Sequence, residues 1–164
     1  MSRIPSATLD ARVRAALDEV YDPEIPVVRI TDLGVVEDVR ATDDAIEVDL
    51  LPTFTGCPAL DAIREDVERA LAPLAGGREV RVRFRRDMAW TSDRINERAR
   101  EAMKEYGLAP PGERRGLTLV QIKVACPYCG SLDTGHDSTF GPTLCRDIRY
   151  CNACRNPFEG FKPK

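Results

Sequence analysis

Residues 126–129 read Cys-Pro-Tyr-Cys and residues 151–154 read Cys-Asn-Ala-Cys, so the chain carries two C-x-x-C sequences with 21 residues between them. Two residues between cysteines let the backbone turn so that both sulfur atoms face one ion. Gly130 follows the first pair and can take the positive φ that commonly follows such a turn. The spacing therefore predicts a tetrahedral metal site with four thiolate ligands: Cys126, Cys129, Cys151 and Cys154.

Zinc in a structural role is the metal that this ligand set predicts. Four thiolates leave no open coordination position, whereas a catalytic zinc keeps one for water or substrate. A segment of about 45 residues buries too little apolar surface to fold by itself, and structural zinc supplies on the order of 10 kcal/mol of binding free energy. Iron in the same cage is the alternative metal, and buried or disulfide-bonded cysteines are the alternative without metal.

The segment that carries these cysteines is therefore predicted to be a small β-rich zinc ribbon. Val120, Ile122 and Val124 alternate with other residues before the first C-x-x-C sequence, and Ile148 and Tyr150 do so before the second. A period of two is typical of short strands, so we expect each C-x-x-C sequence to lie at the tip of a hairpin.

Two further side chains of this segment could take part in metal chemistry. Cys145 is separated from Cys151 by five residues, which does not make another C-x-x-C pair. We therefore expect Cys145 to be a spare thiol, with replacement of one of the four ligands as the alternative. His136 is the only histidine of the chain, and we expect it to be a solvated loop residue.

The first 107 residues show the pattern of an α+β domain with a small sheet covered by helices. Apolar residues recur with helical spacing in three stretches, at residues 7–20, 60–74 and 92–106. Strands are predicted at residues 27–39, with a break at 32–34, and at residues 46–50 and 80–84. The predicted parts of the chain are this domain at residues 1–107, a linker rich in proline and glycine at 108–117, and the ribbon at 118–164.

The composition is that of a globular protein and excludes two classes of partner. Of the 164 residues 43% are apolar, and no apolar run approaches the roughly 18 to 20 residues of a membrane span, so we expect no membrane association. The net charge of −3 argues against nucleic acid as a partner, because such binding depends on clustered lysine and arginine. The first residues lack the apolar core of a secretory signal, so we expect a cytoplasmic protein.

Cys57 is the only cysteine of the first 125 residues, and it directly precedes Pro58. Proline suits the first position of a helix, which would place the thiol at the helix N-terminus. The partial positive charge there lowers the pKa of a thiol and raises its reactivity. The alternative is a small buried apolar residue, as most free cysteines are.

Three successive segments resemble the signatures of the metal–sulfur cluster assembly factor domain over roughly residues 8–86. They read DPEIPV at residues 22–27, TDLGV at 31–35 and TGCP at 55–58. The resemblance implies a role in iron–sulfur cluster maturation, with Cys57 as the reactive position.

Three carboxylates occur in or between these segments: Asp22, Glu24 and Asp32. They could flank Cys57 and help it to hold iron. The alternative is that they cap turns, because carboxylates beside proline and glycine often do so.

Three more segments extend the resemblance to nearly the whole chain. They read MAWT at residues 88–91, EYGLAPP at 105–111 and NPF at 156–158, and they are similar to the D subunits of bacterial phenylacetyl-CoA epoxidase. That resemblance implies an accessory component of the ring 1,2-phenylacetyl-CoA epoxidase of phenylacetate catabolism, without catalysis of its own. This monooxygenase system combines a di-iron oxygenase with a reductase that carries flavin and an iron–sulfur cluster.

Two functions are expected from these resemblances. The first is delivery or maturation of iron or an iron–sulfur cluster for the oxygenase or reductase, with Cys57 as a transient ligand. The epoxidase subunits or the iron–sulfur assembly machinery would then be the partners. The second is a docking or structural subunit of the epoxidase complex in which Cys57 is inert. The sequence leaves open whether the chain forms a homodimer.

Overall fold

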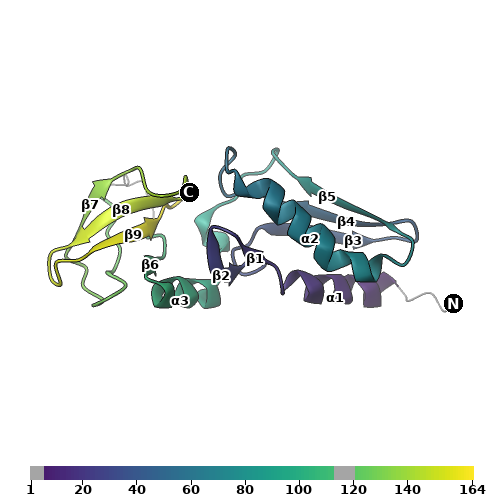
Figure 1. Cartoon of the computed structure of the whole chain (residues 1–164), viewed down its shortest axis with the longest axis horizontal. Helices are drawn as coiled ribbons and strands as arrows, with labels where there is room; N and C mark the ends of the chain where they lie inside the picture. Colours follow the sequence, from purple (N-terminus) through teal and green to yellow (C-terminus); the bar gives the residue numbers. More distant parts are fainter. Residues whose placement is uncertain (1–5, 113–120) are drawn as a thin grey trace. The chain divides into compact units, whose positions relative to one another are not determined.

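The computed structural model describes residues 6–112 and 121–164, with the side chains of Ser6 and Ala7 left out (Figure 1). It divides the chain into two compact units, Met1–Trp90 and Thr91–Lys164. The architecture is the expected α+β domain with a small sheet and helices, followed by a ribbon of short strands. No helix in the described part of the chain is long and apolar enough to cross a membrane.

The described residues of the first unit form two helices and five strands. The helices are α1 (Ser6–Leu17) and α2 (Ala59–Ala75), and the strands are β1 (Tyr21–Asp22), β2 (Ile25–Arg29), β3 (Val36–Ala41), β4 (Ala45–Leu50) and β5 (Glu79–Phe84). Strands β1 and β2 form an antiparallel hairpin. Strand β4 pairs antiparallel with β3 and parallel with β5, so α2 is the crossover between two parallel strands.

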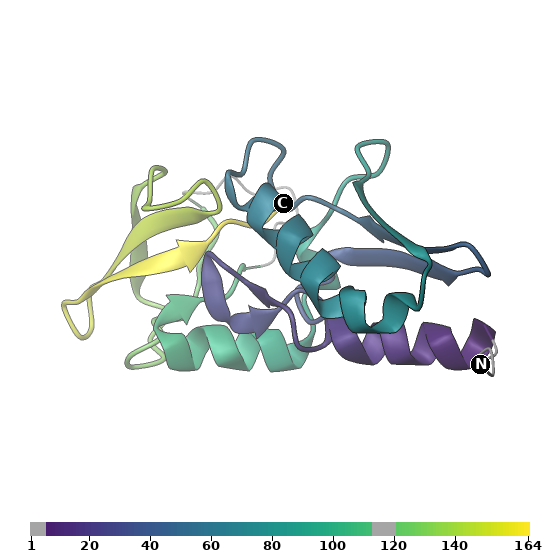
Figure 2. The same ribbon diagram turned by 45° about the vertical axis from the view of Figure 1, so that its right-hand side comes forward.

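The core of this unit lies between its three-stranded sheet and the two helices (Figures 1 and 2). Ile46, Val48 and Leu50 of β4 are fully buried, and α2 contributes Ile63 and Val67 to the buried set. Side chains alternate between the faces of a strand, so Glu47 and Asp49 point to the other face. The period-2 pattern of the sequence arises because one face of β4 is buried in the core and the other carries charged side chains.

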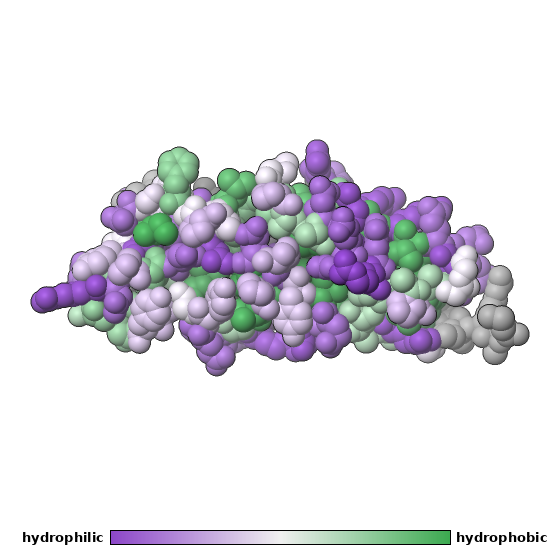
Figure 3. Space-filling view, viewed as in Figure 1, coloured by the Kyte–Doolittle hydropathy of each residue, from purple (hydrophilic) through white to green (hydrophobic). Residues whose placement is uncertain are grey.

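Charged side chains cover the other face of the sheet. Glu47 and Asp49 of β4 form ion pairs with Arg40 of β3 and with Arg81 and Arg83 of β5. The arginines of these pairs are about half exposed, so solvent weakens each pair, and the apolar face covered by the helices contributes more to stability. The face of the molecule that Figure 3 shows is mostly hydrophilic, with scattered hydrophobic residues.

The second unit begins with a short 3₁₀ helix, η1 (Ser92–Arg94), and helix α3 (Glu97–Tyr106). The single helix expected at residues 92–106 is thus two elements. Asn96 separates them and caps α3, because its side chain accepts a hydrogen bond from Ala99 N at 2.9 Å. Gly107 ends the helix with a φ of 87°.

Four short strands form the sheet of this unit in the order β6-β9-β8-β7: β6 (Leu108–Ala109), β7 (Thr134–Ser138), β8 (Arg146–Cys151) and β9 (Pro157–Phe161). Strand β6 pairs parallel with β9, and the other pairs are antiparallel. The second C-x-x-C sequence lies between β8 and β9, which confirms the expected hairpin tip.

The boundary between the two compact units follows Trp90, whereas the sequence pattern predicted that the first domain ends at residue 107. Arg100 of α3 donates to Ser92 O and to Pro111 O, both at 3.1 Å, and these bonds hold the helix within the second unit. Strand β6 occupies the start of the expected linker at 108–117. Residues 113–117 of that linker lie outside the described residues.

The sequence predicted a strand before the first C-x-x-C sequence, and the described residues of this segment form none. Val120 lies outside the described residues, and residues 122–125 belong to no helix or strand and pair with no described strand. Ile122 and Val124 are buried, whereas the residue that follows each of them is exposed. The alternation of apolar residues in the sequence therefore corresponds to alternating burial and not to pairing between strands.

Gly160 of β9 allows the closest approach in the ribbon. A Cβ atom there would collide with Asp147 Oδ1 and lie 2.9 Å from Arg149 Nε, and both of these side chains are buried. We predict that Gly160→Ala destabilises the ribbon by about 1 to 3 kcal/mol, because the surrounding charged groups must shift. Faster amide hydrogen exchange in β8 and β9 measures the loss.

Gly135→Ala is the matched control for this substitution. A Cβ at Gly135, on strand β7 of the same sheet, meets nothing within 4 Å. Its exchange rates should stay near those of the original chain. Equal protection in both variants would show that close packing at Gly160 contributes nothing.

Candidate metal centre and candidate thiol site

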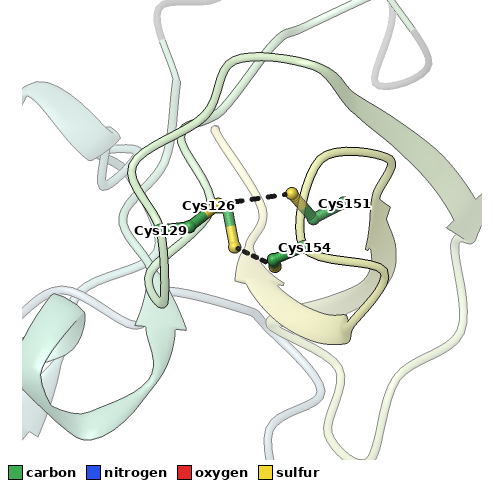
Figure 4. A group of neighbouring side chains, drawn as sticks. All are labelled: Cys126, Cys129, Cys151 and Cys154. Atoms are coloured by element: carbon green, nitrogen blue, oxygen red, sulfur yellow. Dashed lines mark hydrogen bonds between the residues drawn. The ribbon is translucent and has the colours of Figure 1, made fainter.

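The four cysteines of the two C-x-x-C sequences point toward one another from two loops (Figure 4). Cys126 Sγ lies 3.7 Å from Cys154 Sγ, and Cys129 Sγ lies 3.6 Å from Cys151 Sγ. All four sulfur atoms lie within 4.8 Å of one another. A disulfide requires about 2.05 Å, whereas a tetrahedron with metal–sulfur bonds of about 2.3 Å has edges of about 3.8 Å. The spacing fits one ion held by four thiolates.

The two loops repeat the same backbone turn. In the first, Gly130 N donates to Cys126 O at 2.9 Å, and Cys126 N donates to Ser131 O at 2.9 Å. In the second, Arg155 N donates to Cys151 O, and Cys151 N donates to Asn156 O, at the same offsets along the chain. Gly130 has a φ of 73°, and Arg155 matches it with a φ of 59°.

Hydrogen bonds also join one loop to the other. Asn152 of the second loop donates its backbone N–H to Asp133 O and its side-chain amide to Asp133 Oδ1, each at 2.9 Å. Cys126 and Cys151 are almost completely buried in a small apolar cluster with Val124 and other residues. The site is therefore closed by protein on one side and held by both loops.

The thiols interact strongly with one another. The pKa of Cys154 is lowered to about 6, first by a hydrogen bond from the Asn156 side chain and then by the Asn156 backbone and neighbouring thiols. The N–H of Ser131 lowers the pKa of Cys129, but burial and hydrogen bonds with the other three thiols outweigh it and raise that pKa to about 12. Crowded thiols do not all ionise together without a cation, and a bound metal ion supplies that charge.

Cys145 lies outside this group of four sulfur atoms. Its buried thiol is 3.1 Å from Thr143 Oγ1. We expected His136 to be a solvated loop residue, and this expectation is wrong. His136 lies on β7, and its side chain is only 5% exposed. Its Nε2 is 3.6 Å from the carboxylate of Asp147, a buried residue of β8. Strand pairing, which no local pattern indicated, removes His136 from solvent.

Cys57 lies just before helix α2 and is half-buried. The helix begins at Ala59 with Pro58 as its N-cap, so Cys57 lies one residue before the N-cap and not at the cap position that the sequence predicted. Burial raises the pKa of Cys57, a hydrogen bond with the Ala59 backbone lowers it, and the charges of Asp22 and Glu24 raise it. The raising effects prevail, so the expected lowered pKa is wrong.

The carboxylates near Cys57 come from the β1–β2 hairpin. Asp22 Oδ1 accepts hydrogen bonds from Glu24 N at 2.8 Å and from Ile25 N at 3.0 Å, which caps the turn between the two strands. Asp22 and Glu24 both raise the pKa of the Cys57 thiol, and Asp22 also caps the turn. Asp32 is buried. The pKa of Arg29 is raised mainly by its hydrogen bond with Tyr21, and the charge of Asp32 adds to that rise. The place of Asp32 beside Cys57 stays a prediction.

Three residues that shape the two C-x-x-C loops were missed by the sequence analysis: Asp133, Asn152 and Arg155. The equal offset of Gly130 and Arg155 from their C-x-x-C sequences was a signal that could have identified the repeated turn. Asp133 and Asn152 bond from one loop to the other, and nothing in the local pattern indicates their partners.

Two family models match the chain. Residues 10–84 match the iron–sulfur cluster assembly protein family, and residues 110–162 match the PaaD zinc beta ribbon domain. The C-terminal segment is thus a zinc ribbon, in agreement with the spacing of its four sulfur atoms.

Three known proteins are similar to the chain. A protein of Escherichia coli (strain K12) named as the D subunit of 1,2-phenylacetyl-CoA epoxidase is 38% identical over 148 residues, which cover 90% of this chain and 89% of that one. An Fe-S protein maturation auxiliary factor of Porphyromonas gingivalis is 37% identical over 56% of this chain and 84% of its own. A crystal structure of a domain of unknown function, DUF59, from Bacillus anthracis matches with a TM-score of 0.55 and 28% identity, covering 60% and 93% of the two chains.

We predict that serine at any of the four ligand positions, for example Cys126→Ser, releases zinc and makes the ribbon sensitive to protease. The reason is that structural zinc supplies on the order of 10 kcal/mol to such a fold. Elemental analysis and limited proteolysis of the purified protein measure both effects. Cys145→Ala is the control and should keep its zinc, and full zinc content in a serine variant would exclude this ligand set.

We also predict that alkylation of Cys57 rises with pH along a curve whose midpoint lies above that of an ordinary cysteine. A raised pKa leaves less thiolate at neutral pH, so the rate there should be low. Glu24→Gln removes a negative charge and should move the midpoint down. Glu79→Gln, whose carboxylate pairs with Arg81, is the control and should leave it unchanged. An unchanged midpoint in Glu24→Gln would contradict the view that the charge of Glu24 raises the pKa of Cys57.

Proposed function

The chain belongs to the family of 1,2-phenylacetyl-CoA epoxidase D subunits, and from this membership we propose that it delivers or matures iron or an iron–sulfur cluster for the oxygenase or reductase of that epoxidase. Iron or the cluster is the cargo in this proposal, and Cys57 is its transient ligand. The observation that carries the proposal is the match of residues 10–84 to the iron–sulfur assembly family, because this segment holds a single thiol near two carboxylates.

The charges around Cys57 support a cation as cargo. Burial and the carboxylates of Asp22 and Glu24 keep the proton on the thiol, because they disfavour a second negative charge. The same negative charge attracts a metal ion, and a metal ion that binds sulfur displaces the proton. Thiolate and carboxylate together form a mixed ligand set that iron accepts. We include Asp32 as a further neighbour in this proposal.

The ribbon has a separate role in the proposal. Its four thiolates leave no position for cargo, so the zinc that we assign to it is structural. The six cysteines are all free thiols, which fits a reducing compartment, and we propose the cytoplasm. The expected partners are the oxygenase and reductase subunits or the iron–sulfur assembly machinery, and no catalysis on the epoxidase substrate is assigned to this chain.

A second candidate function is that of a docking subunit with an inert Cys57. The observation that favours it is the exposure of several large apolar side chains on the ribbon unit: Tyr128, Leu132, Phe140 and Leu144. Phe140 is 87% exposed, and contact with another protein would remove such side chains from water. This alternative predicts that epoxidation depends on these exposed side chains and not on Cys57.

We predict that Cys57→Ser fails to restore epoxidation in cells that lack the native protein and leaves activity near that of the empty strain. The oxygen of serine is a poor substitute for a thiolate ligand to iron. Phenylacetyl-CoA consumption in cell extracts measures the effect. Cys145→Ala is the matched control, because it also removes a thiol outside the zinc ligand set and should restore activity. Full activity of Cys57→Ser would favour the docking function.

A further inference from the structure

The segment that leads into the first C-x-x-C sequence is held by side chains instead of by strand pairing. Among the described residues, 122–125 pair with no strand. The carbonyl of Ile122 accepts a hydrogen bond from Arg149 Nη1 at 2.8 Å, and the carbonyl of Val124 accepts one from Thr134 Oγ1 at 2.8 Å. Two alternate carbonyls on one side of the segment are thus bonded to the sheet just before Cys126.

Both donors lie beside the second C-x-x-C sequence. Thr134 of β7 is the pairing partner of Cys151 at the end of β8, and Arg149 precedes Cys151 by two residues on the same strand. The two hydrogen bonds therefore connect the approach to the first pair of sulfur atoms with strand β8, which ends at Cys151, and with its neighbour β7.

Arg149 is held in one orientation by a buried carboxylate. Its Nε donates to Asp147 Oδ1 at 3.2 Å and its Nη2 to Asp147 Oδ2 at 3.0 Å, a two-point contact that fixes the plane of the guanidinium. The side chains of Arg149 and Asp147 are 2% and 0% exposed. Gly160, whose missing side chain leaves room for both, completes the arrangement.

A buried ion pair of this kind is a weak source of stability. The cost of removing two charges from water is close to their attraction, and apolar residues of similar volume often serve as well. The Asp147–Arg149 pair therefore calls for a role other than stabilisation. Nη1 of the fixed guanidinium, which donates to Ile122 O, indicates that role.

We propose that Arg149 and Thr134 are positioning residues of the metal centre. Their hydrogen bonds to Ile122 O and Val124 O fix the first C-x-x-C loop against the second, and so maintain the spacing of 3.6 to 3.7 Å between sulfur atoms of the two loops. Asp147 orients Arg149. The inference concerns the ribbon alone and is independent of the delivery function proposed for Cys57.

Two variants of the full-length protein test the proposal. Thr134→Val keeps the shape and branching of the side chain and removes only the donor to Val124. The double variant Asp147→Leu/Arg149→Met replaces the ion pair by apolar residues, which preserves the packing and removes the donor to Ile122. Zinc affinity is measured by competition with a chromophoric chelator. The d–d absorbance of the protein saturated with Co²⁺, which depends on tetrahedral geometry, is measured beside it.

The proposal predicts that each variant binds zinc about tenfold or more weakly, since a buried carbonyl loses its donor. It also predicts an altered Co²⁺ spectrum at saturation, with the circular dichroism of the fold retained. The control is Arg146→Met/Glu159→Leu, which removes another ion pair between strands β8 and β9 and should change neither reading.

Three outcomes would overturn the proposal. The first is an unchanged Co²⁺ spectrum in both variants, even with weaker binding, because a purely structural role lowers the affinity without altering the geometry at saturation. The second is an equal change in the Arg146/Glu159 control, which would indicate general destabilisation of the sheet. The third is a Thr134→Val protein with the original affinity, and this variant keeps the test decisive if the double variant does not fold.

Discussion

The spacing of four sulfur atoms around one ion is the constraint on which the ribbon unit depends. To meet it, both C-x-x-C loops take the same turn, and Arg155 adopts a φ of 59° where the other loop has Gly130. A non-glycine residue in that conformation costs roughly 1 to 2 kcal/mol. A structural zinc ion contributes on the order of 10 kcal/mol, so the strain is small beside the free energy that requires the turn. The order of magnitude explains why the second loop forms without a glycine at this position.

The ligands of this centre could be predicted from the sequence because their signal is local, whereas the residues that position them could not. Two cysteines three positions apart define half a tetrahedron wherever they occur. By contrast, the bonds of Thr134 to Val124 and of Arg149 to Ile122 cross from one segment to another. The apolar alternation of residues 122–124 agrees with the burial of Ile122 and Val124, but it carried no information about which donors the carbonyls of this segment meet. In the α+β unit, too, periodicity predicted the helices and strand β4 but not which segments contact one another.

Cys57 shows how a local rule can give the wrong sign. The sequence around it predicted a helix start, and the structure has one at Ala59, whose backbone does lower the pKa of the thiol. Burial works in the opposite direction and is the largest effect. Asp22 and Glu24 add to it from the β1–β2 hairpin, which is far from Cys57 in the sequence. The direction of the helix-end effect was therefore predicted correctly, but the tertiary environment outweighed it.

The two thiol sites have opposite requirements, and this difference supports separate roles for them. In the ribbon, four sulfur ligands would saturate a tetrahedral ion, so exchange of the metal would require the loss of protein ligands that also hold the fold. At Cys57 one sulfur with nearby carboxylates leaves an incomplete coordination shell, which a cargo metal could share with a donor or an acceptor. Because burial in the first place, and then the charges of Asp22 and Glu24, keep the thiol protonated, binding of a cation to this sulfur would release a proton. Under the proposed delivery function, loading would then be favoured at higher pH and release at lower pH, and release from Cys57 would leave the fold intact, whereas release from the ribbon would not.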